Sequence, residues 1–373
     1  MMVCCRVMSL CACLLACLVY MGERPAHALP KTQAELREIF DGLTKTSIKH
    51  GDIPALFNPP TITVNDASNV YEDEEPMLLV AFPDGIGIRM YPQSTLVWHE
   101  VVNEYLRSRP YCVTYSPISG SFAAYESSVD NVDLIFDSEG RLYNNNSVLI
   151  DRNTGSLWLQ LPGIAFDGPL AGKGLKQLPV LWTDWAHARK AFPKAQVVSR
   201  PRGTSRQYGK DPYGSYHAKD SYYQSDIIYY PLSRLLDRRL PPKTPVVGLE
   251  VENLFFAVDI GYVKKARSVN FFLGPLALLA VYDDAVGSVR VFKRNVWGEV
   301  ALFRMENKQL VDIETGSKWN MDGLAVAGNL KGASLDAVFG VYAFWFAWAA
   351  MYPDTAVVPG PTVVPDSALV KGN

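Results

Sequence analysis

The feature that most constrains this chain is an internal repeat. One eight-residue motif occurs twice, as DRNTGSLW at residues 151–158 and as DIETGSKW at residues 312–319. The likeness extends upstream, where TYSPISGSFAAY (114–125) aligns without a gap with VYDDAVGSVRVF (281–292). Self-similarity at a nearly fixed spacing is typical of a duplicated supersecondary unit. The two copies are therefore expected to fold alike.

The repeat also predicts the domain organisation. A Tyr- and Arg-rich stretch without apolar periodicity separates the two copies, and a loop of that length is usually functional or disordered. We expect it to cross the surface of one or both units. The predicted segments are a signal peptide (1–28), an N-terminal extension (29–74), a first repeat unit (75–200), a crossover loop (201–243), a second repeat unit (244–360) and a C-terminal tail (361–373).

Short alternating apolar runs dominate each copy and predict strands joined by tight turns. Two segments of the first copy have helical spacing instead. Residues 94–106 carry apolar side chains on one face, with Ser94 as a plausible N-cap, and residues 183–192 stop before Pro193. We therefore predict an α+β fold of two tandem homologous units, each a mostly antiparallel sheet with two helices.

The N-terminus has the pattern of an export signal. Arg6 precedes an apolar run that is shorter than the roughly 20 residues needed to span a bilayer, and Ala26-His27-Ala28 forms a small-x-small site. The interpretation is a secretory signal peptide cleaved after Ala28, which gives a periplasmic or secreted protein without a transmembrane segment. Lipid attachment at Cys17 is the alternative.

Composition excludes some functions of the mature chain. Hydrophobic residues make up 48% of the 373 residues, which allows a large core. The net charge of -2 argues against a nucleic-acid-binding protein, because that affinity comes from clustered Lys and Arg. Beyond the signal segment only Cys112 remains, so no intramolecular disulfide is expected. Cys112 lies in an apolar alternation and is expected to be a buried, inert thiol.

The stretch Thr-Tyr115-Ser116-Pro-Ile-Ser119 holds the most suggestive side chains. The spacing of the two serines suits a pair of reactive or ligating groups, and it equally suits a turn entering a strand. In the second copy the aligned residues are Asp283 and Val286, so the serine pair is not needed to fold the unit. Either the first copy alone carries a site, or neither copy does.

Several motifs in a fixed order resemble the bacterial domain of unknown function family 3179. These motifs are Met90-Tyr91-Pro92, WHEVVNEY (98–105), TYSPISGS, DRNTGSLW and FWFAWAAMYPDT (344–355), and they span nearly the whole mature chain. The resemblance implies an exported or lipid-anchored protein without an established activity. In typical members of that family the serine stretch reads TYCPLC. Serine is a poor replacement for a thiolate, which can bind soft metals or form a disulfide.

His99 and Glu100 complete the candidate site with Tyr115, Ser116 and Ser119. The resemblance places His99-Glu100 beside the former thiol pair, where His99 could act as a metal ligand or general base. The alternative is a structural histidine. A Ser-His-acid triad with Glu100 or Asp133 is a further alternative, although no Gly-x-Ser-x-Gly elbow is present. No His-x-x-x-His spacing supports a metal site, so no cofactor is predicted, and a transition metal stays the alternative.

Aromatic side chains supply the candidate ligand contacts. Tyr213 and Tyr216 of the crossover loop and Trp158 of the repeated motif are the predicted ligand-binding residues, although Trp158 also fits a core anchor. The resulting hypothesis is an exported, non-catalytic binding or interaction protein, diverged from a metal or redox Cys-x-x-Cys site. Its partner would be a small molecule or an envelope protein. The alternative is a periplasmic metal-dependent or redox-related enzyme with altered ligands around His99.

Overall fold

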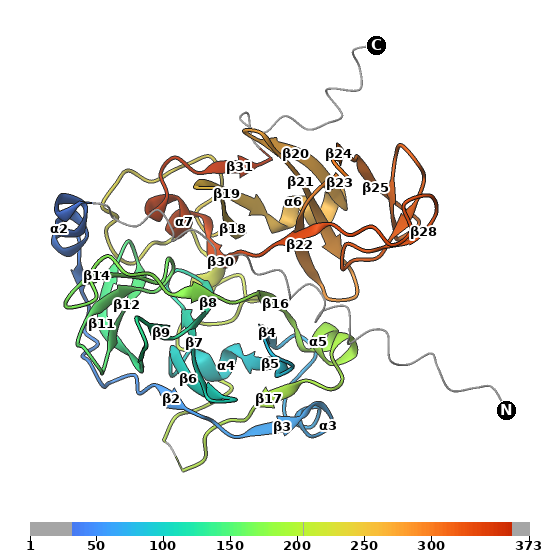
Figure 1. The fold of residues 1–373 in the computed structure, drawn as a ribbon. Helices are drawn as coiled ribbons and strands as arrows, with labels where there is room; N and C mark the ends of the chain where they lie inside the picture. The colour runs from blue at the N-terminus through green and yellow to red at the C-terminus, as the bar shows by residue number, and fades with distance from the viewer. Residues whose placement is uncertain (1–31, 204, 360–373) are drawn as a thin grey trace.

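The computed structural model describes residues 32–203 and 205–359, so the predicted signal peptide, Cys17 and the tail 361–373 lie outside the described residues. The fold is α+β, with many short strands and few helices, as the sequence predicted (Figure 1). No helix among the described residues combines the length and apolarity needed to cross a bilayer. The helices are α2 (Gln33–Asp41), α3 (Val64–Ala67), α4 (Gln93–Leu96), α5 (Trp185–Ala191), α6 (Ile260–Ala266) and α7 (Trp345–Met351).

A nine-stranded sheet, the central sheet, draws strands from both halves of the chain. Its order is β2-β6-β7-β8-β30-β18-β19-β31, and β15 pairs with β8 off this path. The halves meet where β8 and β30 pair, through Phe122 and Tyr342. The strands are β2 (Leu56–Phe57), β6 (Val101–Leu106), β7 (Arg109–Ser116), β8 (Ser121–Glu126), β15 (Lys176–Gln177), β18 (Pro245–Val251), β19 (Leu254–Asp259), β30 (Val341–Phe344) and β31 (Ala356–Val358).

Two further sheets pack against the central sheet, one from each half. The β4 sheet has the order β16-β4-β5-β17-β3, and the β21 sheet has the order β20-β21-β22-β29. The first contains β3 (Thr61–Thr63), β4 (Pro76–Phe82), β5 (Gly87–Pro92), β16 (Val180–Asp184) and β17 (Gln196–Val198). The second contains β20 (Ser268–Leu273), β21 (Leu276–Asp283), β22 (Ser288–Lys293) and β29 (Asp336–Val338).

The core between these sheets explains the apolar alternation of their strands. Along β4, Leu78 and Val80 point into one core cluster, which also contains side chains of the central and β21 sheets, whereas Met77 and Leu79 point into another. Successive side chains of a strand face opposite sides, so β4 is covered on both faces. Cys112 of β7 is a buried free thiol, as predicted, and its burial raises the pKa of the thiol.

Each half also carries a small antiparallel sheet built around the repeated motif. The first is β1-β11-β12-β13-β14 and the second is β25-β26-β27-β28. Two short hairpins, β9–β10 and β23–β24, lie beside them. The bounds are β1 (Thr44–Lys45), β9 (Ser128–Val129), β10 (Val132–Asp133), β11 (Phe136–Tyr143), β12 (Asn146–Asp151), β13 (Leu157–Leu159), β14 (Ile164–Asp167), β23 (Asn295–Val296), β24 (Glu299–Val300), β25 (Phe303–Glu306), β26 (Gln309–Asp312), β27 (Lys318–Trp319) and β28 (Ala325–Ala327).

The predicted helix over residues 94–106 is wrong. Only the one-turn helix α4 forms, and Ser94 lies inside it rather than at its N-cap, which is Pro92. Glu100 has φ of 57°, a left-handed conformation that ends helical geometry, and the chain then enters β6. The β-branched pair Val101-Val102 pairs with β7, so strand pairing in the core overrides the helical spacing. The second predicted helix is present as α5.

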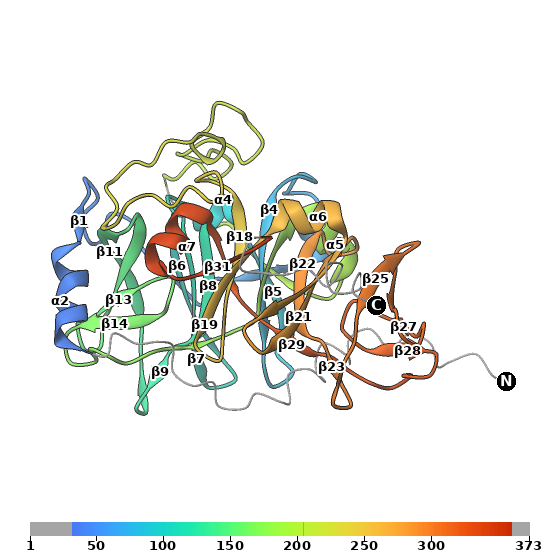
Figure 2. The same cartoon turned by 90° about the horizontal axis from the view of Figure 1, so that it is seen from above.

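The crossover loop contains one short 3-10 helix, Tyr222–Gln224, and no named strand among its described residues. Figure 2 shows the loop on the same side of the molecule as α4 and α7. Tyr222 and Tyr223 are buried, so this segment packs onto the fold rather than extending from it.

Candidate functional site

The serine pair lies in the tight connection between β7 and β8. Ser116 ends β7 and pairs in register with Ser121, the first residue of β8. Gly120 has φ of 57°, and a Cβ atom there would lie 2.6 Å from the Phe344 ring of β30. Only glycine suits both the conformation and this close approach. Ser116 and Ser119 are completely buried by this arrangement.

The hydroxyl of Ser116 belongs to a hydrogen-bonded chain that ends at Glu100. Ser147 Oγ lies 2.9 Å from Ser116 Oγ and 3.1 Å from Glu100 Oε2. Ser138 Oγ donates to the same carboxylate oxygen at 2.8 Å. Burial raises the pKa of Glu100 to about 7, and the two serine hydroxyls oppose that rise. Sequence reasoning named Glu100 and Ser116 but missed the two serines that surround the carboxylate.

Ser119 belongs to a second buried network, on the other side of the turn. Asn146 Nδ2 donates to Ser119 Oγ at 3.1 Å and to Gln160 Oε1 at 2.7 Å. Ser121 Oγ donates to Gln160 Oε1 at 2.6 Å. Gln160 Nε2 in turn donates to Thr114 Oγ1 at 2.8 Å. Each polar group has a protein partner, as buried polar groups require, so the network holds the hairpin without a ligand.

His99 lies next to Glu100 in the chain but makes different contacts. The Pro54 carbonyl oxygen can only accept, so Nδ1 donates to it at 2.7 Å, and Nε2 then accepts from the Tyr208 hydroxyl at 2.6 Å. Burial lowers the pKa of His99, and the positive charge of Arg206 lowers it further. Among residues 32–203 and 205–359, no hydrogen bond joins this ring to Ser116 or Ser119. The structure therefore separates the histidine from the serine pair.

Tyr115 points away from the serines into a cluster with residues of the crossover loop. Its hydroxyl lies 2.7 Å from that of Tyr216, whose ring stacks on Tyr223 with centroids 3.9 Å apart. Gln93 Nε2 donates to Asp211 Oδ2 at 2.7 Å, and the Tyr223 hydroxyl donates to the same atom at 2.8 Å. Burial raises the pKa of Tyr115 and of Asp211. The sequence had pointed to Tyr115 and Tyr216, but not to Gln93 and Asp211.

The loop also covers the serine turn directly. The Tyr222 hydroxyl donates to the Ile118 carbonyl oxygen at 2.7 Å. Lys243 Nζ donates to the Tyr222 carbonyl oxygen at 2.6 Å and lies 3.2 Å from the centroid of that ring. Burial lowers the pKa of Lys243 to about 7. These contacts close the outer side of the turn, and sequence reasoning did not identify Lys243.

The remaining predicted ligand residues are packed into the fold. Tyr213 is partly buried against Tyr222 and Tyr223. Trp158 is completely buried, and its indole N–H donates to Asp151 Oδ2 at 2.9 Å. The second copy of the motif has the same bond, from Trp319 to Asp312, at 3.1 Å.

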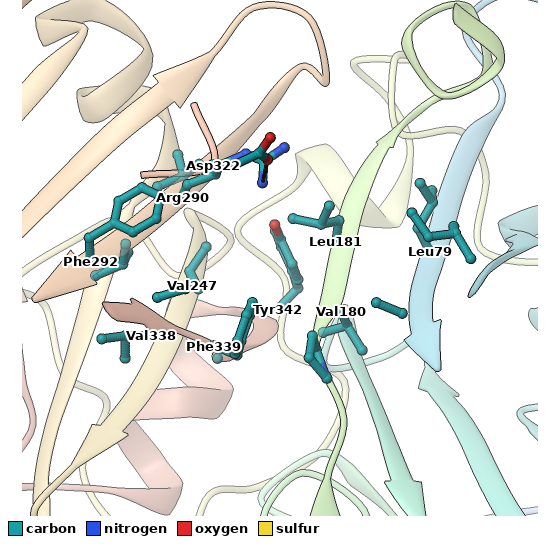
Figure 3. Close-up of a pocket in the computed structure, with 17 residues that line it drawn as sticks. Leu79, Val180, Leu181, Val247, Arg290, Phe292, Asp322, Val338, Phe339 and Tyr342 are labelled. Atoms are coloured by element: carbon teal, nitrogen blue, oxygen red, sulfur yellow. Dashed lines mark ion pairs between the residues drawn. The ribbon is translucent and has the colours of Figure 1, made fainter. Parts of the chain in front are cut away.

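The aligned turn of the second half has a different setting. Asp283 accepts from Arg290 Nε at 2.9 Å, and Arg290 also pairs with Asp322 at 3.2 Å. Arg290 and Asp322 lie at one end of an apolar cleft between β16 and β22 (Figure 3). The cleft has a volume of about 70 Å³. No motif in the sequence had pointed to it, because its lining comes from strands distant along the chain.

No group of three or more His, Cys, Asp or Glu in the described part of the chain is arranged to hold a metal ion. A comparison with curated proteins and a comparison with solved structures found no match. The family described as "protein of unknown function (DUF3179)" matches residues 50–355, which include the serine turn, the crossover loop and both copies of the repeated motif. The chain therefore belongs to the DUF3179 family.

Proposed function

We propose that this chain is an exported, non-catalytic binding or interaction protein built from two homologous α+β units. The observation that carries the proposal is that the hydroxyl groups of the serine turn already have hydrogen-bond partners within the protein. Ser116 and Ser119 are completely buried, and their hydroxyls contact Ser147 and Asn146 rather than a base. A nucleophile needs a base within hydrogen-bond reach and access for a substrate. At this turn no base bonds either hydroxyl directly, and neither serine is exposed to a substrate.

The two-unit part of the proposal is supported by local features that recur in both halves. Trp158 and Trp319 make the same bond to the aspartate that opens each motif. The isolated bridge between Ile164 and Gly174 recurs between Leu324 and Ser334. Such details follow from a shared backbone path. Residue boundaries at 75–200 and 244–360 remain predictions.

The loss of a former thiol site is tested by metal content. We would purify the natural protein and the Ser116→Cys/Ser119→Cys variant without chelators, and quantify bound transition metals by mass spectrometry. The single variants Ser116→Cys and Ser119→Cys are matched controls, because one thiolate cannot form the pair. We expect metal only in the double variant. Stoichiometric metal in the natural protein would contradict the proposal, and no metal in either protein would indicate redox rather than metal chemistry in the ancestral site.

Catalysis is tested separately. An activity of the purified protein that is abolished by Ser116→Ala or His99→Ala would overturn the non-catalytic role. One observation favours that second candidate, an enzyme with altered ligands near His99. The pKa of Glu100, raised to about 7 by burial, suits proton transfer, and Ser147 connects this carboxylate to Ser116.

Export is proposed from the N-terminal pattern alone. Expression of the full chain in a host with a periplasm, followed by N-terminal sequencing of the mature protein, is expected to give Leu29 as the first residue. A lipid-modified Cys17 at the N-terminus would replace the soluble form with an anchored one. An uncleaved cytoplasmic product would contradict both forms of the prediction.

A further inference from the structure

The cleft between β16 and β22 exists because the two strands approach each other without pairing. β16 is the terminal strand of the β4 sheet, and β22 pairs with β29 only over Val291–Lys293. At one end Thr183 Oγ1 donates to the Val286 carbonyl oxygen, which ties the strands together. At the corresponding junction of the central sheet, β8 and β30 do pair. The structure thus has one closed and one open junction between its halves.

Nearly all side chains along the open junction are aliphatic or aromatic. Val180 and Leu181 come from β16, and Val247 of β18 lies across the cleft from them (Figure 3). Val291 of β22 also lines the cleft. Tyr342 also lines the cleft, and its hydroxyl lies 2.7 Å from Ser288 Oγ. An apolar lining of this kind favours a hydrocarbon group, because transfer of apolar surface from water into it is favourable.

The size of the cleft limits what can enter. A volume of about 70 Å³ is roughly half of the 150 Å³ cavity that holds benzene in an engineered protein core. A cleft of this volume cannot enclose an aromatic ring, whereas it can enclose an unbranched chain of a few carbons. Longer chains would extend from the open side of the cleft.

The charged end of the cleft selects the head group. Two carboxylates, Asp283 and Asp322, face one guanidinium, Arg290. Asp283 is nearly buried, with its side chain 3% exposed, and its second oxygen accepts the Ala285 backbone N–H, whereas Asp322 is 26% exposed at the opening. Two carboxyl groups beside one guanidinium give this end of the cleft a formal excess of one negative charge. A cationic group would be attracted there and a carboxylate repelled.

We propose that this cleft binds a small aliphatic primary amine, with the hydrocarbon chain between β16 and β22 and the ammonium group beside Asp322. The inference rests on the proposed binding role and names the ligand class for it. An ammonium group supplies three hydrogen-bond donors, which suits a carboxylate side chain that is partly exposed at the opening. The apolar chain and the charged head match the two ends of the cleft.

The test is calorimetric titration of the natural protein with ethyl-, propyl- and butylammonium chloride, with sodium butyrate and benzylammonium as comparison ligands. Affinity is expected to rise roughly fourfold for each added methylene group, since each buries about the same apolar surface. Butyrate and benzylammonium are expected to bind at least tenfold more weakly than butylammonium. Equal binding of butylammonium and butyrate would overturn the proposal, as would no detectable binding of any amine.

Variants of residues that line the cleft, with one control elsewhere, locate the site. Asp322→Asn is expected to weaken butylammonium binding about tenfold, whereas Asp130→Asn, which removes an aspartate paired with Lys173 elsewhere, is expected to have no effect. Ala337→Leu fills the cleft from β29 and is expected to abolish binding. If this variant unfolds, Ala81→Leu fills the cleft from β4 instead. Binding that survives in whichever filled variant folds would place the ligand elsewhere and contradict the inference.

Failure of this test differs from failure of the proposed function. If no amine binds, while the metal and activity assays give the results expected above, only the ligand class is wrong. If an activity depends on Ser116 or His99, the non-catalytic role is wrong whatever the titrations show.

Discussion

The serine turn of the first half and the turn aligned with it in the second half have different surroundings. In the first half the turn is closed by Phe344 and by Tyr222 of the crossover loop. In the second half the turn is tied to β16 through Thr183, and the ion pair of Asp283 and Arg290 follows at the end of an open cleft. The crossover loop therefore contacts the first turn through Tyr222, whereas β16 contacts the second turn through Thr183.

This difference distinguishes the residues that both halves need to fold from the residues that give each turn its own surroundings. The residues that both halves keep, such as the Asp-Thr-Gly-Ser-Trp motif, make the same internal bonds in each copy. The residues that differ, serines in one turn and charged groups in the other, lie where the surroundings differ. Shared residues are therefore expected to contribute equally to stability, and differing residues to contribute unequally.

The largest expected effect concerns the Asp-Thr-Gly-Ser-Trp motif that both halves contain. Asp151→Ala and Asp312→Ala each remove a buried carboxylate that accepts from a threonine and from a tryptophan N–H. Leaving those donors without partners is expected to destabilise each variant by about 3 kcal/mol. Urea denaturation of both proteins measures this loss. Losses that differ by more than about 1 kcal/mol would show that the two motifs are not equivalent.

The second prediction concerns Glu100, which has a raised pKa in the first half. In the folded chain the carboxyl titrates near pH 7, whereas its ordinary value is 4.5. Between these values the folded state retains a proton that the unfolded state has released, so this carboxyl contributes a loss of stability as pH rises through the window. Above pH 7 the loss amounts to roughly 3 kcal/mol.

Glu100→Gln removes this dependence. The difference in unfolding free energy between variant and natural protein is expected to grow from pH 4.5 to pH 7, in favour of the variant, and then to stay constant. The contribution of His99 is present in both proteins and cancels in the difference. Glu72→Gln, at an exposed position, is the control. A difference that does not change with pH would mean that the carboxylate is already ionised at low pH in the fold.

The third prediction compares the two turn glycines. A Cβ atom at Gly120 would lie 2.6 Å from the buried Phe344 ring, whereas at Gly287 the nearest atoms, 3.0 Å away, belong to the side chains of His187 and Thr183. Both glycines have positive φ, so alanine is strained at each. Gly120→Ala is expected to destabilise by about 3 kcal/mol, and Gly287→Ala by about 1 kcal/mol, because the half-exposed His187 can move. Equal losses in thermal unfolding would contradict the difference in closure.

Much of the fold could be predicted from the sequence because it depends on local patterns. Alternating apolar runs gave β4, β5, β7 and β8, and the helical spacing before Pro193 gave α5. The helix expected over residues 94–106 failed at Glu100, whose left-handed φ depends on the burial of its side chain among serines of another sheet. Propensity cannot detect such a tertiary requirement.

The candidate site was predicted in part, for the same reason. The residues of the serine turn were identified from the sequence. The sequence could not show that Asn146 and Gln160 form hydrogen bonds with the serine hydroxyl groups there. Polar residues inside an apolar strand, such as Asn146 in β12, are the signal that could have indicated this network. The cleft left no such signal, because Arg290 and Asp322 meet the apolar wall only after both halves have packed together.

The smallest expected effect tests whether Ser116 has only a structural role in the serine turn. Ser116→Ala removes a hydroxyl that contacts Ser147 Oγ and also accepts the Ser147 backbone N–H, so a loss of about 2 kcal/mol is expected from two buried hydrogen bonds. Ser288→Ala is the matched control, because this buried serine also has one hydroxyl contact, with Tyr342. Small losses of stability in both variants, with unchanged binding of alkylammonium ions, would agree with a purely structural serine. If Ser116→Ala instead removed a function that Ser288→Ala preserved, the closed turn would open in solution, and the first half rather than the cleft would hold the working site.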